Sequence, residues 1–216
     1  MRLYDEIQAL KAQMMQQIPK EALAVMEQAM EELARSGIVD HSLKAGDQAP
    51  DFTLPDTHGD NIRLTDTLGQ GPVVLSFYRG GWCPYCNLEL HALQQALPRI
   101  QKLHAQLIAV SPESPDHSLS TVEKQDLEFE VLNDQGNMVA RKFGLVFALP
   151  EALRPLYESF GIDLPAWNGD DSFELPMPAT YVIDTDARIL DAFVDTDYTQ
   201  RMEPERVLDV LASHRA

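Results

Sequence analysis

The sequence predicts an α/β sandwich, in which a mixed central sheet carries helices on both faces behind a helical N-terminal extension. Two observations predict the sheet. From residue 72 the chain alternates short apolar runs rich in β-formers with amphipathic stretches, in the order β-α-β-α-β. Strands joined by crossover helices pair in parallel through right-handed connections. Two apolar runs at 179–184 and 189–194, separated by a turn, add an antiparallel hairpin.

Residues 1–40 are predicted to form helices that precede the main domain at 41–216. A first apolar stripe consists of Leu3, Ile7, Leu10 and Met14. A second stripe follows Pro19 and consists of Leu23, Met26, Met30 and Leu33. Both stripes have helical spacing, and Gly37 is expected to end the second helix. The stripes pack either on the main domain or on a second copy of the chain, so a homodimer through these helices is one expectation.

The elements of the main domain are predicted in order along the chain. A first hairpin is expected over 51–64, with its turn at 55–60. The expected core strands cover 72–78, 106–110 and 129–132. The expected helices that follow them cover 83–104, 115–125 and 137–143. Beyond these, we expect a helix within 150–160, a long irregular loop over 164–178 and a closing helix over 204–211.

The stretch from Phe77 to Leu90 reads FYRGGWCPYCNLEL and holds both cysteines of the chain, Cys83 and Cys86. Two glycines end a buried strand there, and a helix begins at the cysteines. A helix N-terminus offers unpaired N–H groups and a partial positive charge, which lower the pKa of a thiol below about 8.5. Two thiols one helical turn apart can close a disulfide, and C-x-x-C beside a βαβ unit is typical of thioredoxin-like redox proteins.

Composition excludes several other classes of function. The net charge of −17 disfavours binding to nucleic acid or to anionic membranes. The charged N-terminus is unlike a secretory signal, and no apolar run approaches the about 20 residues that span a bilayer, so we predict a cytoplasmic protein. A zinc site normally needs two pairs of ligands, and the sequence has neither a second C-x-x-C nor an H-x-x-x-H. We therefore expect no metal and no cofactor.

Three segments carry a resemblance to a known family. They are GDQAPDFTL at 46–54, the pair Phe77–Tyr78 before the cysteines, and PATYVID at 178–184. From Asp47 to Leu211, the chain resembles the peroxiredoxin-like proteins of the alkyl hydroperoxide reductase/thiol-specific antioxidant family. The resemblance implies a thioredoxin-like fold and a thiol-dependent peroxidase that reduces hydrogen peroxide or organic hydroperoxides. It also implies a thioredoxin- or glutathione-type thiol reductant as the partner.

The cysteines depart from the pattern of that family. Peroxiredoxins usually show P-x-x-x-T/S-x-x-C, whose cysteine attacks the peroxide. Laid on this pattern, Cys86 takes the attacking place, Cys83 replaces the Thr/Ser and Arg79 replaces the proline. The helix N-terminus instead favours Cys83, because the first thiol of such a pair normally lies nearer the exposed helix end. We expect Cys83 to attack and Cys86 to resolve, with the reverse order as the alternative, and Arg79 to assist as a cation beside the thiolate.

Five further residues are candidates for substrate contact. Trp82 precedes the first cysteine and Tyr85 lies between the two. The pair Trp-Cys resembles thioredoxins, and Cys-Pro-Tyr-Cys resembles glutaredoxins. Peroxiredoxins tend to carry an arginine two residues before the threonine of the late strand, here Thr180. That place is Pro178, which resembles the cis-proline that faces the C-x-x-C pair in thioredoxins, and Arg201 is a candidate to substitute for the missing arginine.

Three functions follow from these features. The family resemblance favours a thiol-dependent peroxidase that works through a Cys83–Cys86 disulfide. The C-x-x-C site also fits a thiol–disulfide oxidoreductase that acts on protein or small-molecule disulfides, with Pro178 helping to dock the substrate. A redox-responsive interaction protein, whose disulfide changes how the N-terminal helices bind a partner, is the third alternative.

Overall fold

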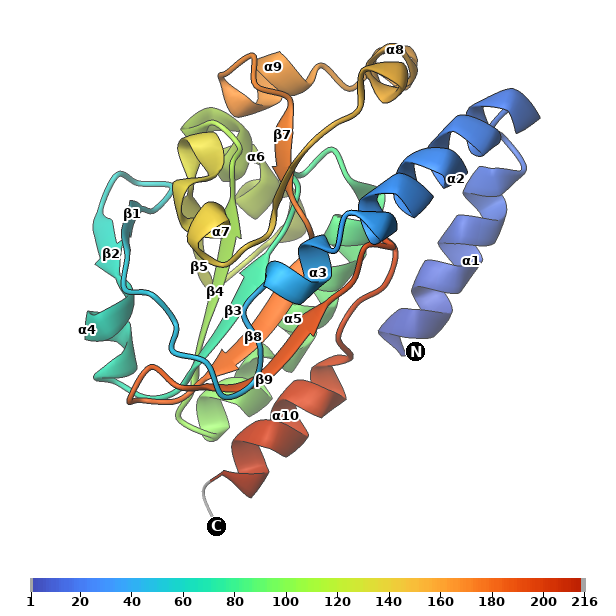
Figure 1. Ribbon diagram of the computed structural model, residues 1–216. Coiled ribbons are helices and arrows are strands. Elements are labelled where there is room, and N and C mark those ends of the chain that lie inside the picture. Colours follow the sequence, from blue (N-terminus) through green and yellow to red (C-terminus); the bar gives the residue numbers. More distant parts are fainter. Residues whose placement is uncertain (1, 215–216) are drawn as a thin grey trace.

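The computed structural model describes residues 2–214 and contains the expected mixed sheet (Figure 1). Its five strands are β3 (Val73–Phe77), β4 (Gln106–Ser111), β5 (Glu130–Asn133), β8 (Ala179–Ile183) and β9 (Ile189–Val194). They lie in the order β5-β4-β3-β8-β9. The first three pair in parallel, and β8 and β9 are antiparallel additions. The predicted α/β class is therefore confirmed, with β3 at the centre of the sheet.

Helices cover both faces of this sheet. One face carries α5 (Pro84–Lys102), α6 (Pro115–Gln125) and α10 (Pro204–Ser213), and the other carries α4 (Leu64–Leu68) and α7 (Met138–Lys142). Successive side chains of β3 alternate between the two cores, because Val74 packs with the α5 cluster while Val73 and Leu75 pack with the α7 cluster. Across residues 2–214, every helix is too short or too polar to span a lipid bilayer.

The smaller elements lie around the edges of the sheet. The predicted first hairpin is present as β1 (Thr53–Pro55) and β2 (Asn61–Arg63). The prediction of one long irregular loop over 164–178 was wrong, since this stretch contains α9 (Leu164–Asn168) and β7 (Glu174–Pro176). Pro165, one of the residues that indicated a loop, lies instead in the first turn of α9. The Asp163 side chain, just before the helix, accepts a hydrogen bond from Ala166 N.

β7 pairs with a strand that the sequence did not indicate, β6 (Val146–Ala148). Between β6 and α9 lie a short 3-10 turn, η2 (Glu151–Leu153), and α8 (Arg154–Ser159). An apolar cluster of Leu149, Leu153, Tyr157, Leu164 and Leu175 holds this region together. The stretch is therefore a small packed unit beside the sheet, and it brings Tyr157 toward the end of β3.

The N-terminal helices α1 (Leu3–Met15), α2 (Lys20–Arg35) and α3 (Ile38–His41) lie against the main domain (Figure 1). α1 packs on α5, and its Leu3 and Ile7 are buried in the same apolar cluster. Gly37 follows α2 with a φ of 72°, a left-handed conformation that suits glycine, so the predicted helix end is confirmed. The division into an extension at 1–40 and a domain at 41–216 stays a prediction.

Candidate active site

The two cysteines lie where β3 passes through a tight turn into α5. Cys83 is the residue before the helix, and Pro84 opens the helix at a position where a missing N–H costs nothing. Gly81 approaches α6 so closely that a Cβ on it would lie 2.1 Å from Thr121 Oγ1. The Asn87 side chain donates a hydrogen bond to Gly81 O at 2.9 Å. The turn that carries the thiols is therefore fixed from both sides.

A buried carboxylate holds the same turn from the neighbouring strand. Glu113, just beyond the end of β4, accepts hydrogen bonds from Gly81 N at 2.7 Å and from Tyr78 Oη at 3.0 Å. Burial raises the pKa of Glu113 above its ordinary value, although these hydrogen bonds oppose the shift. Sequence reasoning missed this residue. Its position in the sequence could have indicated it, because Glu113 follows the predicted strand that pairs in parallel with β3. The carboxyl ends of parallel strands meet at one edge of the sheet, where the thiols also lie.

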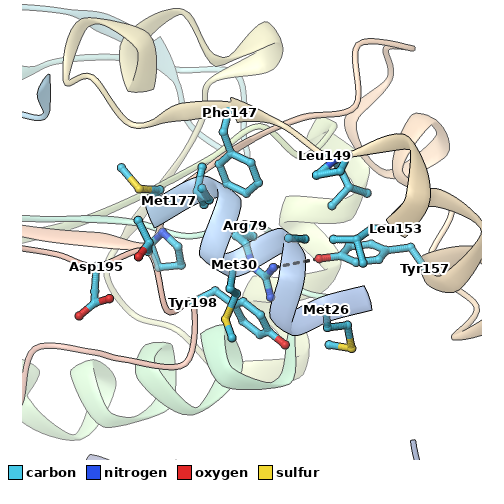
Figure 2. Close-up of a pocket in the computed structure, with 15 residues that line it drawn as sticks. Met26, Met30, Arg79, Phe147, Leu149, Leu153, Tyr157, Met177, Asp195 and Tyr198 are labelled. Atoms are coloured by element: carbon cyan, nitrogen blue, oxygen red, sulfur yellow. Dashed lines mark hydrogen bonds between the residues drawn. The ribbon is translucent and has the colours of Figure 1, made fainter. Parts of the chain in front are cut away.

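Arg79 contacts the first cysteine directly. Its Nη2 lies 3.0 Å from Cys83 Sγ, and its Nη1 donates a hydrogen bond to Tyr157 Oη at 3.1 Å (Figure 2). The guanidinium also lies over two aromatic rings, with its Cζ 4.9 Å from the centroid of Trp82 and 4.2 Å from that of Tyr198. Arg79 is only 3% exposed. The cation is therefore held in one position beside the sulfur by hydrogen bonds and ring stacking.

The environment separates the pKa values of the two thiols. Burial favours the neutral form of Cys83, but a hydrogen bond from Cys86 and the charges of Arg79 and Arg201 outweigh it and hold the pKa of Cys83 well below its usual value. Burial raises the pKa of Cys86, and its hydrogen bond to Cys83 raises it further. The two opposite shifts therefore favour the thiolate on Cys83 over the thiolate on Cys86.

A second arginine contacts the second cysteine. Arg201 Nη2 lies 3.3 Å from Cys86 Sγ, and Arg201 Nε pairs with the carboxylate of Glu89. Both side chains of this ion pair are 2% exposed. Thr180 Oγ1 donates a hydrogen bond to the other oxygen of Glu89 at 3.1 Å. Each sulfur thus has an arginine of its own, and the arginine at Cys86 is oriented by a buried carboxylate.

The remaining candidates take different places. Tyr85 is buried and packs against Tyr198 with ring centroids 5.8 Å apart, and Trp82 is half-buried against Tyr157. Pro178 lines a narrow cavity of about 40 Å³ that Arg79 also lines. The described residues contain no cis peptide bond, so the likeness of Pro178 to a thioredoxin cis-proline does not extend to its peptide geometry. Thr180 donates to Glu89, and its contact with a substrate stays a prediction.

One reason for choosing Cys83 was wrong. We expected the first thiol to be the exposed one, but Cys83 and Cys86 are both 0% exposed. Residues of α2 line the cavity that contains Arg79 at this end of the sheet. The thiolate character of Cys83 therefore depends on nearby charges and a hydrogen bond, and not on contact with water.

Sequence reasoning also missed Tyr157, Tyr198 and Glu89. Tyr157 lies in the stretch of weakest pattern, and Tyr198 lies in the loop after β9, so neither had a local signal. Glu89 stands three residues after Cys86 on α5, and a charged residue on the apolar face of that helix was the one available sign. Within residues 2–214, no group of three or more His, Cys, Asp or Glu side chains is arranged to hold a metal ion.

The Glu89–Arg201 pair predicts a large loss of stability when one partner is neutralised. Glu89→Gln leaves the Arg201 charge buried without its counter-ion, which is expected to lower the free energy of unfolding by about 3–5 kcal/mol. Glu205→Gln is the matched control, because Glu205 pairs with Arg99 on the surface, where solvent screens the pair, and its expected cost is far smaller. Urea denaturation of the reduced proteins measures both values, and equal costs would contradict the buried pair.

Comparisons with known proteins agree with this fold. The model of the AhpC/TSA family matches residues 45–192. Peroxiredoxin Bcp of Escherichia coli is 34% identical over 103 residues, which cover 48% of this chain and 65% of that protein. A putative peroxiredoxin of Mycobacterium tuberculosis is 26% identical over 174 residues, covering 81% of this chain and 99% of its own.

The crystal structure of peroxidoxin BcpB from Mycobacterium tuberculosis superposes with a TM-score of 0.64 at 25% identity. The superposition covers 81% of this chain and 99% of the other chain, so the expected thioredoxin-like fold is confirmed. The chain spans slightly less than two thirds of the length of the Escherichia coli relative. The family match covers more than half of this chain, and the chain therefore belongs to the AhpC/TSA family.

Proposed function

We propose that the protein is a thiol-dependent peroxidase that reduces hydroperoxides through a Cys83–Cys86 dithiol–disulfide cycle. The contact of 3.0 Å between Arg79 Nη2 and Cys83 Sγ carries the proposal, because it supports a thiolate on a buried sulfur. Membership of the AhpC/TSA family and similarity to peroxiredoxins support the same reaction. Cys86, a neutral thiol one helical turn away, fits the resolving role.

The proposed cycle has three balanced steps. The Cys83 thiolate attacks the terminal oxygen of a hydroperoxide, the O–O bond breaks, and the leaving alkoxide or hydroxide takes up a proton. The product on Cys83 is a sulfenic acid. The Cys86 thiol then condenses with it to form the disulfide and release water. A dithiol or glutathione-type reductant returns two electrons and two protons by thiol–disulfide exchange.

Two buried donors, on Arg79 and on Trp82, the residue before Cys83, support binding of the peroxide. Arg79 Nε and Trp82 Nε1 have no hydrogen-bond partner within the described residues. Buried donors without a partner are costly, and sites of chemistry are where such groups occur. Peroxide oxygens can accept these hydrogen bonds, and a donor that strengthens its bond as charge develops on the leaving oxygen lowers the barrier. The dithiol and these donors together provide a nucleophile, a resolving thiol and oxygen binding.

The test is peroxide-dependent consumption of a thiol reductant. The reduced protein is mixed with hydrogen peroxide or cumene hydroperoxide, and reductant oxidation is followed with thioredoxin and its reductase or with glutathione. We expect turnover with at least one pair of peroxide and reductant, and none for the double variant Cys83→Ser/Cys86→Ser. Absence of turnover with every pair, together with rapid reduction of insulin disulfides, would contradict the peroxidase proposal.

That outcome would instead favour a thiol–disulfide oxidoreductase, the second candidate. The C-x-x-C pair, with Pro178 lining the same cavity as Arg79, is the observation that favours it. A reduction potential of about −270 to −200 mV would fit that activity. Both activities need access to the buried pair, because a disulfide substrate and a protein reductant alike must reach sulfurs that are 0% exposed.

A cytoplasmic location and a homodimer through the N-terminal helices stay predictions. The redox-responsive interaction protein is also a prediction at this stage. Size-exclusion chromatography of the reduced and the oxidised protein tests the last two together. An oligomeric state that changes with oxidation supports a redox-responsive interface, and a monomer in both forms contradicts the dimer.

A further inference from the structure

Helix α2 forms one wall of the cavity that contains Arg79. It contributes Met26, Ala29, Met30 and Leu33 to the lining. The opposite side holds Arg79, Tyr157, Pro178 and Tyr198. Figure 2 shows Met26 and Met30 lining the pocket that holds the Arg79 guanidinium and its hydrogen bond to Tyr157. Helix α2 lies outside the residues that the family model matches. It therefore adds a wall, specific to the N-terminal extension, beside the arginine that contacts Cys83.

The contacts that hold α2 in place are apolar and incomplete. None of its residues is fully buried. Within residues 2–214, the side chains of α2 form no hydrogen bond or ion pair with the main domain. Their polar contacts, such as the hydrogen bond from Gln28 to Glu32, join residues of α2 or of its C-terminal end. Its stripe meets the domain through half-buried Val25, Met26 and Ala29, which pack on the Leu149–Leu175 cluster. Such a helix detaches at lower cost than one with buried residues and polar anchors.

Helix α1, by contrast, is fastened to the domain. The backbone N–H groups of Leu3 and Tyr4 donate to the Glu203 carboxylate at 3.3 and 2.7 Å. Lys11 Nζ lies 3.4 Å from Asp197 Oδ2 and 3.2 Å from Thr199 Oγ1. The difference allows α2 to move while α1 stays seated. The chain changes direction at both ends of α2. A non-helical link at 16–19 precedes the helix, and Gly37, in a left-handed conformation, follows it.

The cavity reaches the thiolate only through Arg79, which lines the cavity and whose Nη2 lies 3.0 Å from Cys83 Sγ; neither cysteine is part of the lining. The cavity volume of about 40 Å³ leaves space for one or two molecules the size of water. A small peroxide is in this range. A protein thiol is far larger, and it must approach Cys86 or Cys83 along the line of the S–S bond. With both sulfurs 0% exposed, a protein cannot make that approach to the closed form.

We propose that the α2 stripe of Met26, Ala29, Met30 and Leu33 is a displaceable cover that selects the reactants of the dithiol by size. Small molecules reach Cys83 in the closed form, and bulky ones reach it only when α2 lifts from the domain. The stripe is thus a specificity-determining element of the site. Access to the thiols is independent of the reaction they perform, so the cover can be tested with reagents that involve neither peroxide nor reductant.

The first test compares a small and a large alkylating reagent on the reduced wild-type protein. Iodoacetamide and a polyethylene glycol maleimide are each calibrated on a cysteine-containing peptide, and mass spectrometry follows modification of Cys83. We expect the calibrated rate with the large reagent to be at least about tenfold lower than with the small one, because only the open form reacts with it. Equal calibrated rates would overturn the proposal.

A matched pair of variants tests the role of α2 itself. Ala29→Gln places a long polar side chain in the apolar cavity wall, where it replaces the packing of half-buried Ala29 on the domain. Ala24→Gln makes the same change on the exposed side of α2. Glutamine is close to alanine in helix propensity, so the two variants differ in contact and not in helix formation. We expect Ala29→Gln to raise the rate with the large reagent at least about tenfold and Ala24→Gln to leave it unchanged.

Equal rates for the Ala29→Gln variant and the wild type would overturn the proposal. A second measurement keeps it testable if that variant fails to fold. Hydrogen exchange of the wild-type protein is expected to show faster exchange of α2 amides than of α1 and α5 amides under native conditions. Protection of α2 equal to that of α5 would mean that the cover opens only with global unfolding, which contradicts a displaceable helix.

Discussion

Replacement of Cys83 by serine is expected to reduce the rate of reaction with peroxide at least about a thousandfold, because it removes the thiolate that attacks oxygen. Replacement of Cys86 by serine is expected to keep that first step within about tenfold of the wild type and to stop the cycle after it. The reason is the division of roles in the pair, since Cys83 has the lowered pKa and Cys86 the raised one. Stopped-flow mixing of the reduced proteins with peroxide measures the first step.

The fate of the sulfur provides the control for these variants. In Cys86→Ser, a sulfenic acid on Cys83 is expected to persist long enough for chemical trapping and mass spectrometry, whereas the wild type is expected to yield the disulfide. The opposite result, a fast first step in Cys83→Ser with the sulfenic acid on Cys86, would assign the attack to the cysteine that the peroxiredoxin pattern favours. Loss of the first step in both variants would mean that each thiol needs the other for activation.

The position of the thiols was predictable from sequence because its causes are local. A buried strand, two glycines and an amphipathic helix follow one another directly, and the structure contains β3, the turn and α5 in that order between residues 73 and 102. The parallel pairing of β3, β4 and β5 followed from the same local pattern, because strands joined by crossover helices pair in parallel. The short strands β6 and β7 had no such pattern, and their pairing depends on contacts with the neighbouring cluster of apolar side chains.

The charges around the thiols were less predictable because they come from distant parts of the chain. Arg201 reaches Cys86 across 115 residues, and it is held there by Glu89 on α5. Tyr157 joins Arg79 from 78 residues away. The sequence indicated Arg79 and Arg201 as cations without showing which sulfur each one contacts. That assignment requires the fold, as does the discovery that α2 covers the cavity.

Exposure and charge therefore make separate contributions to the reactivity of Cys83. The expectation that the attacking thiol is exposed assumed that water stabilises its charge, whereas here burial opposes the thiolate and nearby donors overcome that opposition. A buried thiolate held by a fixed arginine is sensitive to the loss of that arginine, because no solvent replaces it. This dependence makes Arg79 the residue whose substitution has the largest expected effect after the cysteines themselves.

Arg79→Met is expected to raise the pKa of Cys83 and to slow its reaction with peroxide about a hundredfold or more at neutral pH. Methionine fills a similar apolar volume but removes the charge and the hydrogen bond to Cys83 Sγ at 3.0 Å. Burial, which raises the pKa of a thiol, is then opposed mainly by Cys86 and Arg201. The pKa is measured by the ultraviolet absorbance of the thiolate, and the rate by stopped-flow mixing with peroxide.

The pH dependence distinguishes loss of the thiolate from loss of the fold. The rate with peroxide rises with pH up to the pKa of the attacking thiol and is constant above it, since only the thiolate reacts. In the wild type the rise is expected to end well below the ordinary thiol pKa of about 8.5. In Arg79→Met the same rise is expected to move to higher pH, so part of the lost rate returns in alkaline solution. Arg79→Lys keeps the charge without the planar fork and is expected to lie between the two. A uniform loss of rate at every pH, with an unchanged midpoint, would show that Arg79 acts on the peroxide oxygen and not on the thiolate.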